Sequence, residues 1–102
     1  MATTRVSINS PLAVEVAFRQ ETVGALRRVG EKLETMLSEL KGLEREVRTL
    51  TGPPREKRIA LYQQIRSDAE YQRWCLVVQR EAIGLFDHSE VDLMYPVPPV
   101  VK

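Results

Sequence analysis

Residues 26–50, LRRVGEKLETMLSELKGLEREVRTL, decide the fold of this chain. Leucine or valine stands at positions 26, 33, 40 and 47, and a second apolar series follows three positions after each of them, at 29, 36, 43 and 50. Two interleaved series of this kind form one stripe on an α-helix, and a stripe without polar interruption over four heptads is typical of a coiled coil. The stretch predicts a long helix that packs along a second one.

The residues on either side set the limits of this helix. Ser10 and Pro11 form a favourable start, because a hydroxyl can cap a helix and proline suits its first position. Gly52 and the two prolines after it end the helix, since glycine accepts a left-handed conformation and proline cannot continue the hydrogen-bond ladder. The sequence therefore predicts a helix over about 11–50, although positions 14, 16 and 18 also alternate like a strand.

A second helix is expected over about 54–86. Its apolar stripe, interrupted by Gln72 and Gln79, consists of Ile59, Tyr62, Ile65, Ala69, Leu76, Ile83 and Phe86. A turn as short as 51–54 implies antiparallel packing. If two residues face each other across the helices when their residue numbers sum to about 109, apolar residues meet in nearly every layer of the hairpin. The two glutamines would then either fix this register within the seam or lie on the surface.

These patterns predict an all-α protein in three parts. An N-terminal segment, 1–10, precedes an antiparallel helical hairpin over 11–86, and a proline-rich tail follows over 87–102. The first helix also carries Gly24, Gly30 and Gly42 in its interior. Each glycine costs about 1 kcal/mol relative to alanine, so we expect close approaches of other parts of the chain to offset this cost.

Composition narrows the classes of function. The 102 residues suit one domain, and the 15 basic and 14 acidic side chains nearly cancel, so no global field favours nucleic acid or anionic lipid. No apolar run approaches the ~20 residues of a membrane span, and residues 1–10 lack the apolar core of a signal peptide. A single cysteine excludes an internal disulfide. We expect a cytoplasmic protein without membrane insertion.

The second helix has more apolar surface than one seam uses. Trp74, Val77, Val78 and Leu85 lie outside the stripe and predict a second apolar face that a partner covers. A second copy would complete a four-helix bundle, the commonest closed arrangement.

The tail adds Leu93 and Tyr95 to the candidate interaction residues. Two interpretations stay open for it. The tail could dock into an aromatic groove of another protein, since Pro96 and Pro99 have the Pro-x-x-Pro spacing. We favour the second interpretation, in which Leu93, Met94 and Tyr95 cover the second helix of the same chain, because a freely exposed tail is rarely so apolar.

The turn between the helices is basic. Arg48, Arg55, Lys57 and Arg58 surround Glu56, so the turn could contact an anionic partner or could simply be solvated. A nucleic-acid platform usually adds exposed aromatic residues, and none flank this turn. We therefore consider nucleic acid an unlikely partner.

Catalytic motifs are weak. His88, the single histidine, lies beside Asp87, and Cys75 falls within an apolar helical run where a thiol is usually inert. The sequence has no Glu-x-x-His spacing for a metal and no phosphate-binding glycine loop, so we expect no enzyme activity, metal or cofactor. The sequence predicts a non-enzymatic helical adaptor or scaffold that binds itself and other proteins. The alternatives are a chaperone-like binder of a partner helix and a nucleic-acid accessory protein that uses the basic turn.

Overall fold

The computed structural model describes the backbone of residues 11–101 and the side chains of residues 13–101. It contains helices α1 (Pro11–Thr49), α2 (Gly52–Ala82) and α3 (Ser89–Met94). These helices hold 83% of the described residues, and that part of the chain has no strand. The predicted all-α hairpin is thereby confirmed, and residues 11–20 are helical rather than extended. The expected cap at Ser10 and the segment 1–10 lie outside the described residues.

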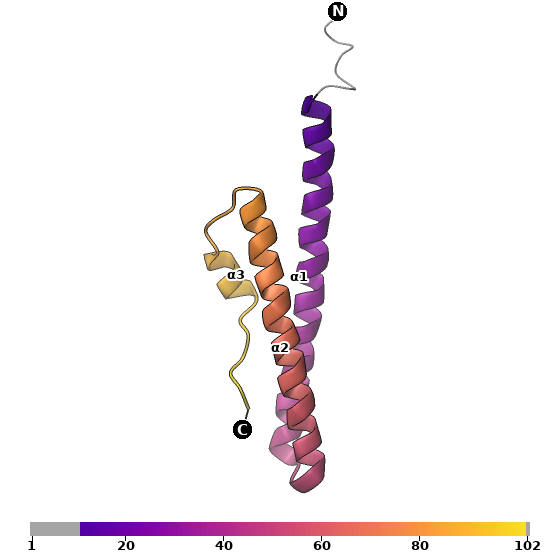
Figure 1. The fold of residues 1–102 in the computed structure, drawn as a ribbon. Helices are drawn as coiled ribbons and strands as arrows, with labels where there is room; N and C mark the ends of the chain where they lie inside the picture. Colours follow the sequence, from indigo (N-terminus) through magenta and orange to yellow (C-terminus); the bar gives the residue numbers. More distant parts are fainter. Residues whose placement is uncertain (1–10, 102) are drawn as a thin grey trace, which may run out of the picture.

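The turn between α1 and α2 forms as its residue types require. Gly52 has φ +67°, the left-handed conformation that glycine accepts readily, and prolines occupy the first positions of α2 after it. The amide of Leu50 still donates to the Glu46 carbonyl at 3.1 Å, so α1 keeps its hydrogen bonding up to the turn. The two helices therefore fold back and pack antiparallel along their length (Figure 1).

The hairpin seam contains the residues that the sequence pairs. Both members of the pairs Leu33–Leu76, Leu40–Ala69 and Val47–Tyr62 are buried. Gln72 and Gln79, which interrupt the stripe, are half-buried. The Oε1 atom of Gln79 is buried and has no hydrogen-bond partner among the described residues. An unpaired buried acceptor lowers stability, so Gln79 is a weak point of the seam.

Helix α2 ends at Ala82, four residues before the expected end at 86. The cause is Gly84, whose φ of +90° lets the amides of Gly84 and Leu85 donate to the carbonyls of Glu81 and Arg80, at 3.0 and 2.9 Å. This is the Schellman arrangement that closes many helices. The prediction that Phe86 continues the seam is therefore wrong: Phe86 lies beyond the helix and is 71% exposed.

Helix α1 is longer than its partner. With 39 residues against 31, it continues past the end of α2 on the side away from the turn (Figure 1). We call residues 11–25 of α1 the α1 extension. Leu26 still packs against the core, whereas four large apolar residues of the extension are exposed. They are Val14, Val16, Phe18 and Val23.

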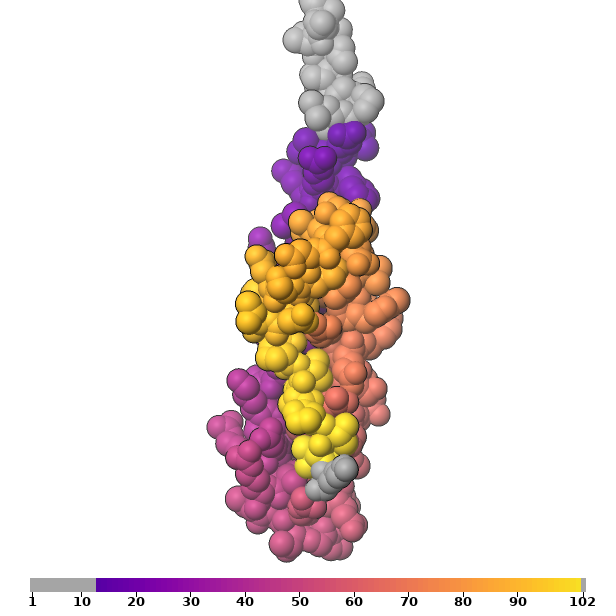
Figure 2. Space-filling model, turned by 90° about the vertical axis from the view of Figure 1, so that its left-hand side faces the viewer, coloured from indigo at the N-terminus to yellow at the C-terminus, as the bar shows by residue number. Residues whose placement is uncertain are grey.

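After Gly84 the chain turns back along the hairpin. Helix α3 and residues 95–101, which we call the tail segment, lie over the side of the hairpin where α1 and α2 are both in view (Figure 2). Val91 and Tyr95 are buried and belong to the same core cluster as the seam. The expectation that the tail packs on its own hairpin agrees with this arrangement. Leu93 and Met94, however, do not cover α2: they are 81% and 60% exposed, because the short helix α3 turns Val91 inward instead.

Candidate interaction site

One face of α2 presents large apolar side chains to solvent. Tyr71, Trp74 and Val78 follow one another at helical spacing and are 60%, 60% and 42% exposed. The rings of Tyr71 and Trp74 stack, with centroids 6.0 Å apart and an angle of 29° between their planes. The stacked rings form one continuous aromatic patch on this face.

This face continues toward the α1 extension. Ala82 follows Val78 by one helical turn and lines a groove of about 510 Å³ together with Ile83 of the turn after α2. The other wall of the groove comes from Phe18, Arg19 and Val23 of α1. We call Tyr71, Trp74, Val78, Ala82 and this groove the outer face. It joins both helices at the end of the hairpin where α1 loses its partner.

The other predicted interaction residues lie elsewhere. Val77 is half-buried and packs against the core, and Tyr95, the first residue of the tail segment, is buried in the core cluster. Leu85 is 43% exposed but lies after the end of α2, so it does not extend the helical face as its spacing suggested. Leu93 is exposed on α3. The structure thus brings Trp74 and Val78 together with Tyr71, which the sequence analysis did not single out.

Cys75 and His88 have separate partners. The Tyr71 phenol forms a hydrogen bond with Cys75, which raises the pKa of the phenol above its ordinary value of 10.0. The Nε2 atom of His88 lies 3.1 Å from Oε2 of Glu81, one residue before Ala82. Asp87, beside His88, accepts hydrogen bonds from the amide and hydroxyl of Ser89, which lower the pKa of its carboxyl group. These contacts organise the turn before α3.

The basic turn is partly neutralised. Arg48 pairs with Glu44 at 2.5 Å, and Arg58 pairs with Glu46 across the hairpin at 3.3 Å. Lys57 is exposed and Arg55 is half-buried. The turn is therefore less available to an external anion than its sequence suggested, although the ion pairs are exposed and individually weak.

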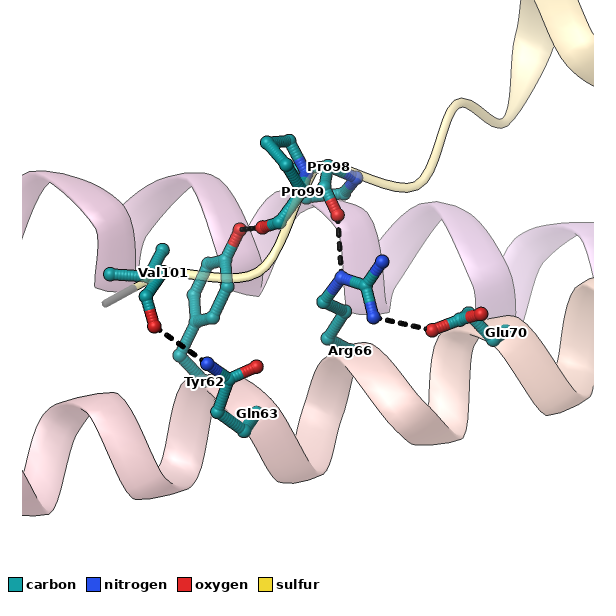
Figure 3. A network of polar contacts seen from close by, with 7 residues as sticks. All are labelled: Tyr62, Gln63, Arg66, Glu70, Pro98, Pro99 and Val101. Atoms are coloured by element: carbon teal, nitrogen blue, oxygen red, sulfur yellow. Dashed lines mark hydrogen bonds and ion pairs between the residues drawn. The ribbon is translucent and has the colours of Figure 1, made fainter.

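A separate site, made of polar side chains of α2, binds the tail segment (Figure 3). The hydroxyl of Tyr62 donates to the Pro99 carbonyl at 3.0 Å, Nε2 of Gln63 to the Val101 carbonyl at 2.7 Å, and Nε of Arg66 to the Pro98 carbonyl at 2.7 Å. Burial raises the pKa of the Tyr62 phenol, which keeps its donor proton in place. None of these three side chains was predicted as a donor from the sequence.

Two further properties bear on function. None of the helices within residues 11–101 is both long and apolar enough to cross a lipid bilayer. In the same range, no three side chains of the types that ligate metals gather at one place. Comparison with known proteins found no matching family model, no matching curated protein and no matching solved structure.

Proposed function

We propose that this protein is a non-enzymatic helical adaptor that works by helix–helix association, first of all with a second copy of itself, in a reducing cytoplasm. The observation that carries the proposal is the outer face, on which a stacked Tyr71–Trp74 pair leads into the groove beside Phe18. Apolar patches of this kind are a mark of interaction sites in soluble proteins. Tryptophan and tyrosine are also enriched among residues that dominate binding energy.

A helical partner fits the shape of the outer face. The face is a ridge of side chains along α2 that leads into the groove beside the α1 extension, and α1 continues past the end of α2 there. A helix laid along this ridge would contact α2 and the α1 extension together, and two copies doing so would form a four-helix bundle. The C₂ symmetry common in homodimers would let each copy supply the same face.

The test is the double variant Trp74→Ala/Val78→Ser. Both side chains are exposed, so the hairpin should keep its helicity by circular dichroism. Removing a central tryptophan and its neighbour should raise the dissociation constant of self-association at least about tenfold, measured by light scattering over a concentration series.

The matched control is Val100→Ser. Val100 is a similarly exposed apolar residue, but it lies on the tail segment. This variant should associate like the wild type. If the wild-type chain is a monomer at all concentrations, self-association is wrong, and binding of a different partner's helix by the same face becomes the remaining form of the proposal. If Trp74→Ala/Val78→Ser keeps the wild-type mass, the outer face is not the interface.

A further inference from the structure

The hairpin binds its tail segment through hydrogen bonds to the main chain of that segment. The three contacts from α2 all run from a side-chain donor to a backbone carbonyl, those of Pro98, Pro99 and Val101. Pro99 and Val100 are exposed, so their side chains contribute little to recognition, whereas Val101 packs against the core cluster and adds one apolar contact. The donors Tyr62, Gln63 and Arg66 lie within two turns of one helix (Figure 3). This site therefore recognises a chain conformation more than a particular sequence.

The recognised conformation is an extended one rich in proline. Residues 95–101 contain three prolines, and no helix extends beyond Met94 in the described residues. A polyproline-like chain has no internal hydrogen bonds, so its carbonyls are free to accept from a receptor. Domains that bind proline-rich peptides use this property, together with the low entropy cost of ordering such a chain.

The tail segment does not fill its site. A groove of about 600 Å³ remains between the tail segment and α1. Its α1 wall consists of Glu34, Leu37, Ser38, Lys41 and Glu44. Glu44 on this wall already pairs with Arg48, so Glu34 is the carboxylate that a cationic side chain on a ligand would approach. A segment with a large basic residue at the position of Val97, which borders the groove, would make contacts that the chain's own tail leaves unmade.

We propose that the side of the hairpin formed by the three α2 donors and this α1 wall is a binding site for an extended, proline-rich segment of another protein, and that the tail segment is its intramolecular occupant. The ligand is held through its carbonyls by Tyr62, Gln63 and Arg66, and a basic side chain enters the groove beside Glu34. A second copy's tail is the less favoured source, because exchange between identical chains reproduces the same contacts and adds the cost of association. This proposal does not depend on the outer face.

In any binding experiment the chain's own tail segment competes with an added peptide. A tethered segment has an effective concentration in the millimolar range, so a free peptide competes poorly with it. The full-length variant Pro98→Gly/Pro99→Gly keeps both carbonyls but loosens the tail, because glycine increases the entropy of the undocked chain. The probe is a synthetic peptide with the sequence of residues 94–102, MYPVPPVVK, and the readout is the Nε–H resonance of Arg66 by NMR.

The peptide should bind the glycine variant about tenfold more tightly than the wild type. A peptide with Val97→Arg should bind about threefold more tightly again, through the carboxylate of Glu34. Adding Gln63→Ala to the glycine variant should weaken binding several-fold. Gln64→Ala is the matched control, because Gln64 lies one position away and donates to Asp68 instead, so it should leave binding unchanged.

Several results would overturn the proposal. It fails if the glycine variant keeps its helicity and does not bind the peptide at millimolar concentration, or if Gln63→Ala and Gln64→Ala have equal effects. If the glycine variant does not fold, the single variant Pro99→Gly takes its place, and an Arg66 Nε–H signal that does not move up to millimolar peptide rejects the site. If the wild type is a dimer that the peptide dissociates, the occupant is a second copy's tail and the proposed source is wrong. None of these outcomes alters the Trp74→Ala/Val78→Ser test.

Discussion

Gly30 shows how one missing side chain can place a distant part of the chain. A Cβ atom at Gly30 would lie 2.7 Å from the hydroxyl oxygen of Tyr95, which is closer than real Cβ atoms approach a neighbour. A Cβ at Gly42 would meet nothing within 4 Å, and one at Gly24 would meet only the side chain of Arg28 at 3.5 Å. Of the three glycines inside α1, only Gly30 thus makes room for another element.

We expect alanine substitution to change stability differently at Gly42 and at Gly30. Gly42→Ala should raise the free energy of unfolding by about 1 kcal/mol, because alanine favours the helix and the site is open. Gly30→Ala should give no such gain, since the new methyl group collides with the buried Tyr95. In a Tyr95→Phe background the hydroxyl is absent, and Gly30→Ala should then stabilise like Gly42→Ala. Urea unfolding of all these variants measures their free energies of unfolding. Equal increases for the alanine variants at positions 30 and 42, each made in the wild type, would contradict this prediction.

At the scale of the helices, the seam between α1 and α2 depends on apolar pairs with one polar defect. Gln79 is half-buried in the seam, and its Oε1 atom lacks a hydrogen-bond partner in the described chain. Gln79→Leu removes this acceptor and adds apolar burial, so it should raise the free energy of unfolding by about 1 kcal/mol.

Thermal and urea unfolding measure the effect of Gln79→Leu. Arg27→Ala serves as the reference, because Arg27 is exposed and off the seam, and should change stability by under about 0.5 kcal/mol. A loss of stability in Gln79→Leu would mean that the amide makes a favourable contact in the seam, as polar residues that fix register do.

The seam between the helices could be predicted from the sequence, whereas the end of α2 was predicted wrongly. The seam was predictable because a heptad repeat constrains many residues at once, and Leu33, Leu40 and Val47 are buried as expected. The end of α2 was missed although Gly84 was a visible stop signal, because Leu85 and Phe86 continue the apolar pattern beyond it.

The site for the tail segment could not be read from local patterns. Arg66 and Pro98 are far apart in sequence, and a side chain that donates to a distant carbonyl leaves no period or spacing to detect. Tyr62 was recognised only as a seam residue, and Gln63 and Arg66 looked like ordinary surface positions of a helix. Nor could the sequence tell which of three glycines receives Tyr95, since that depends on where the tail docks in space.

At the scale of the whole molecule, charge is balanced and the exposed features are apolar. The 15 basic and 14 acidic residues leave no net field, and cations such as Arg48 and Arg58 pair with carboxylates. If the outer face drives association, raising the salt concentration from about 0.05 M to about 0.5 M should leave the dissociation constant within about threefold, because screening acts on charges and not on apolar contacts.

Sedimentation or light scattering at the two salt concentrations checks this expectation. Sodium sulfate is a useful third condition, since it should strengthen apolar association. A steep loss of association with salt would instead indicate that charged groups dominate, and it would return attention to the basic turn around Lys57.

The contact between Tyr95 and Gly30 also bears on the order of events in folding. The helices can pair outward from the turn at Gly52 through contacts that are close in sequence, whereas Tyr95 needs both α1 and α2 in position before it can dock. We therefore expect its contacts to form after the rate-limiting step of hairpin formation, and contacts that form late slow unfolding without speeding refolding. On this expectation, loss of the Tyr95 contact would speed unfolding of the hairpin and leave its folding rate unchanged.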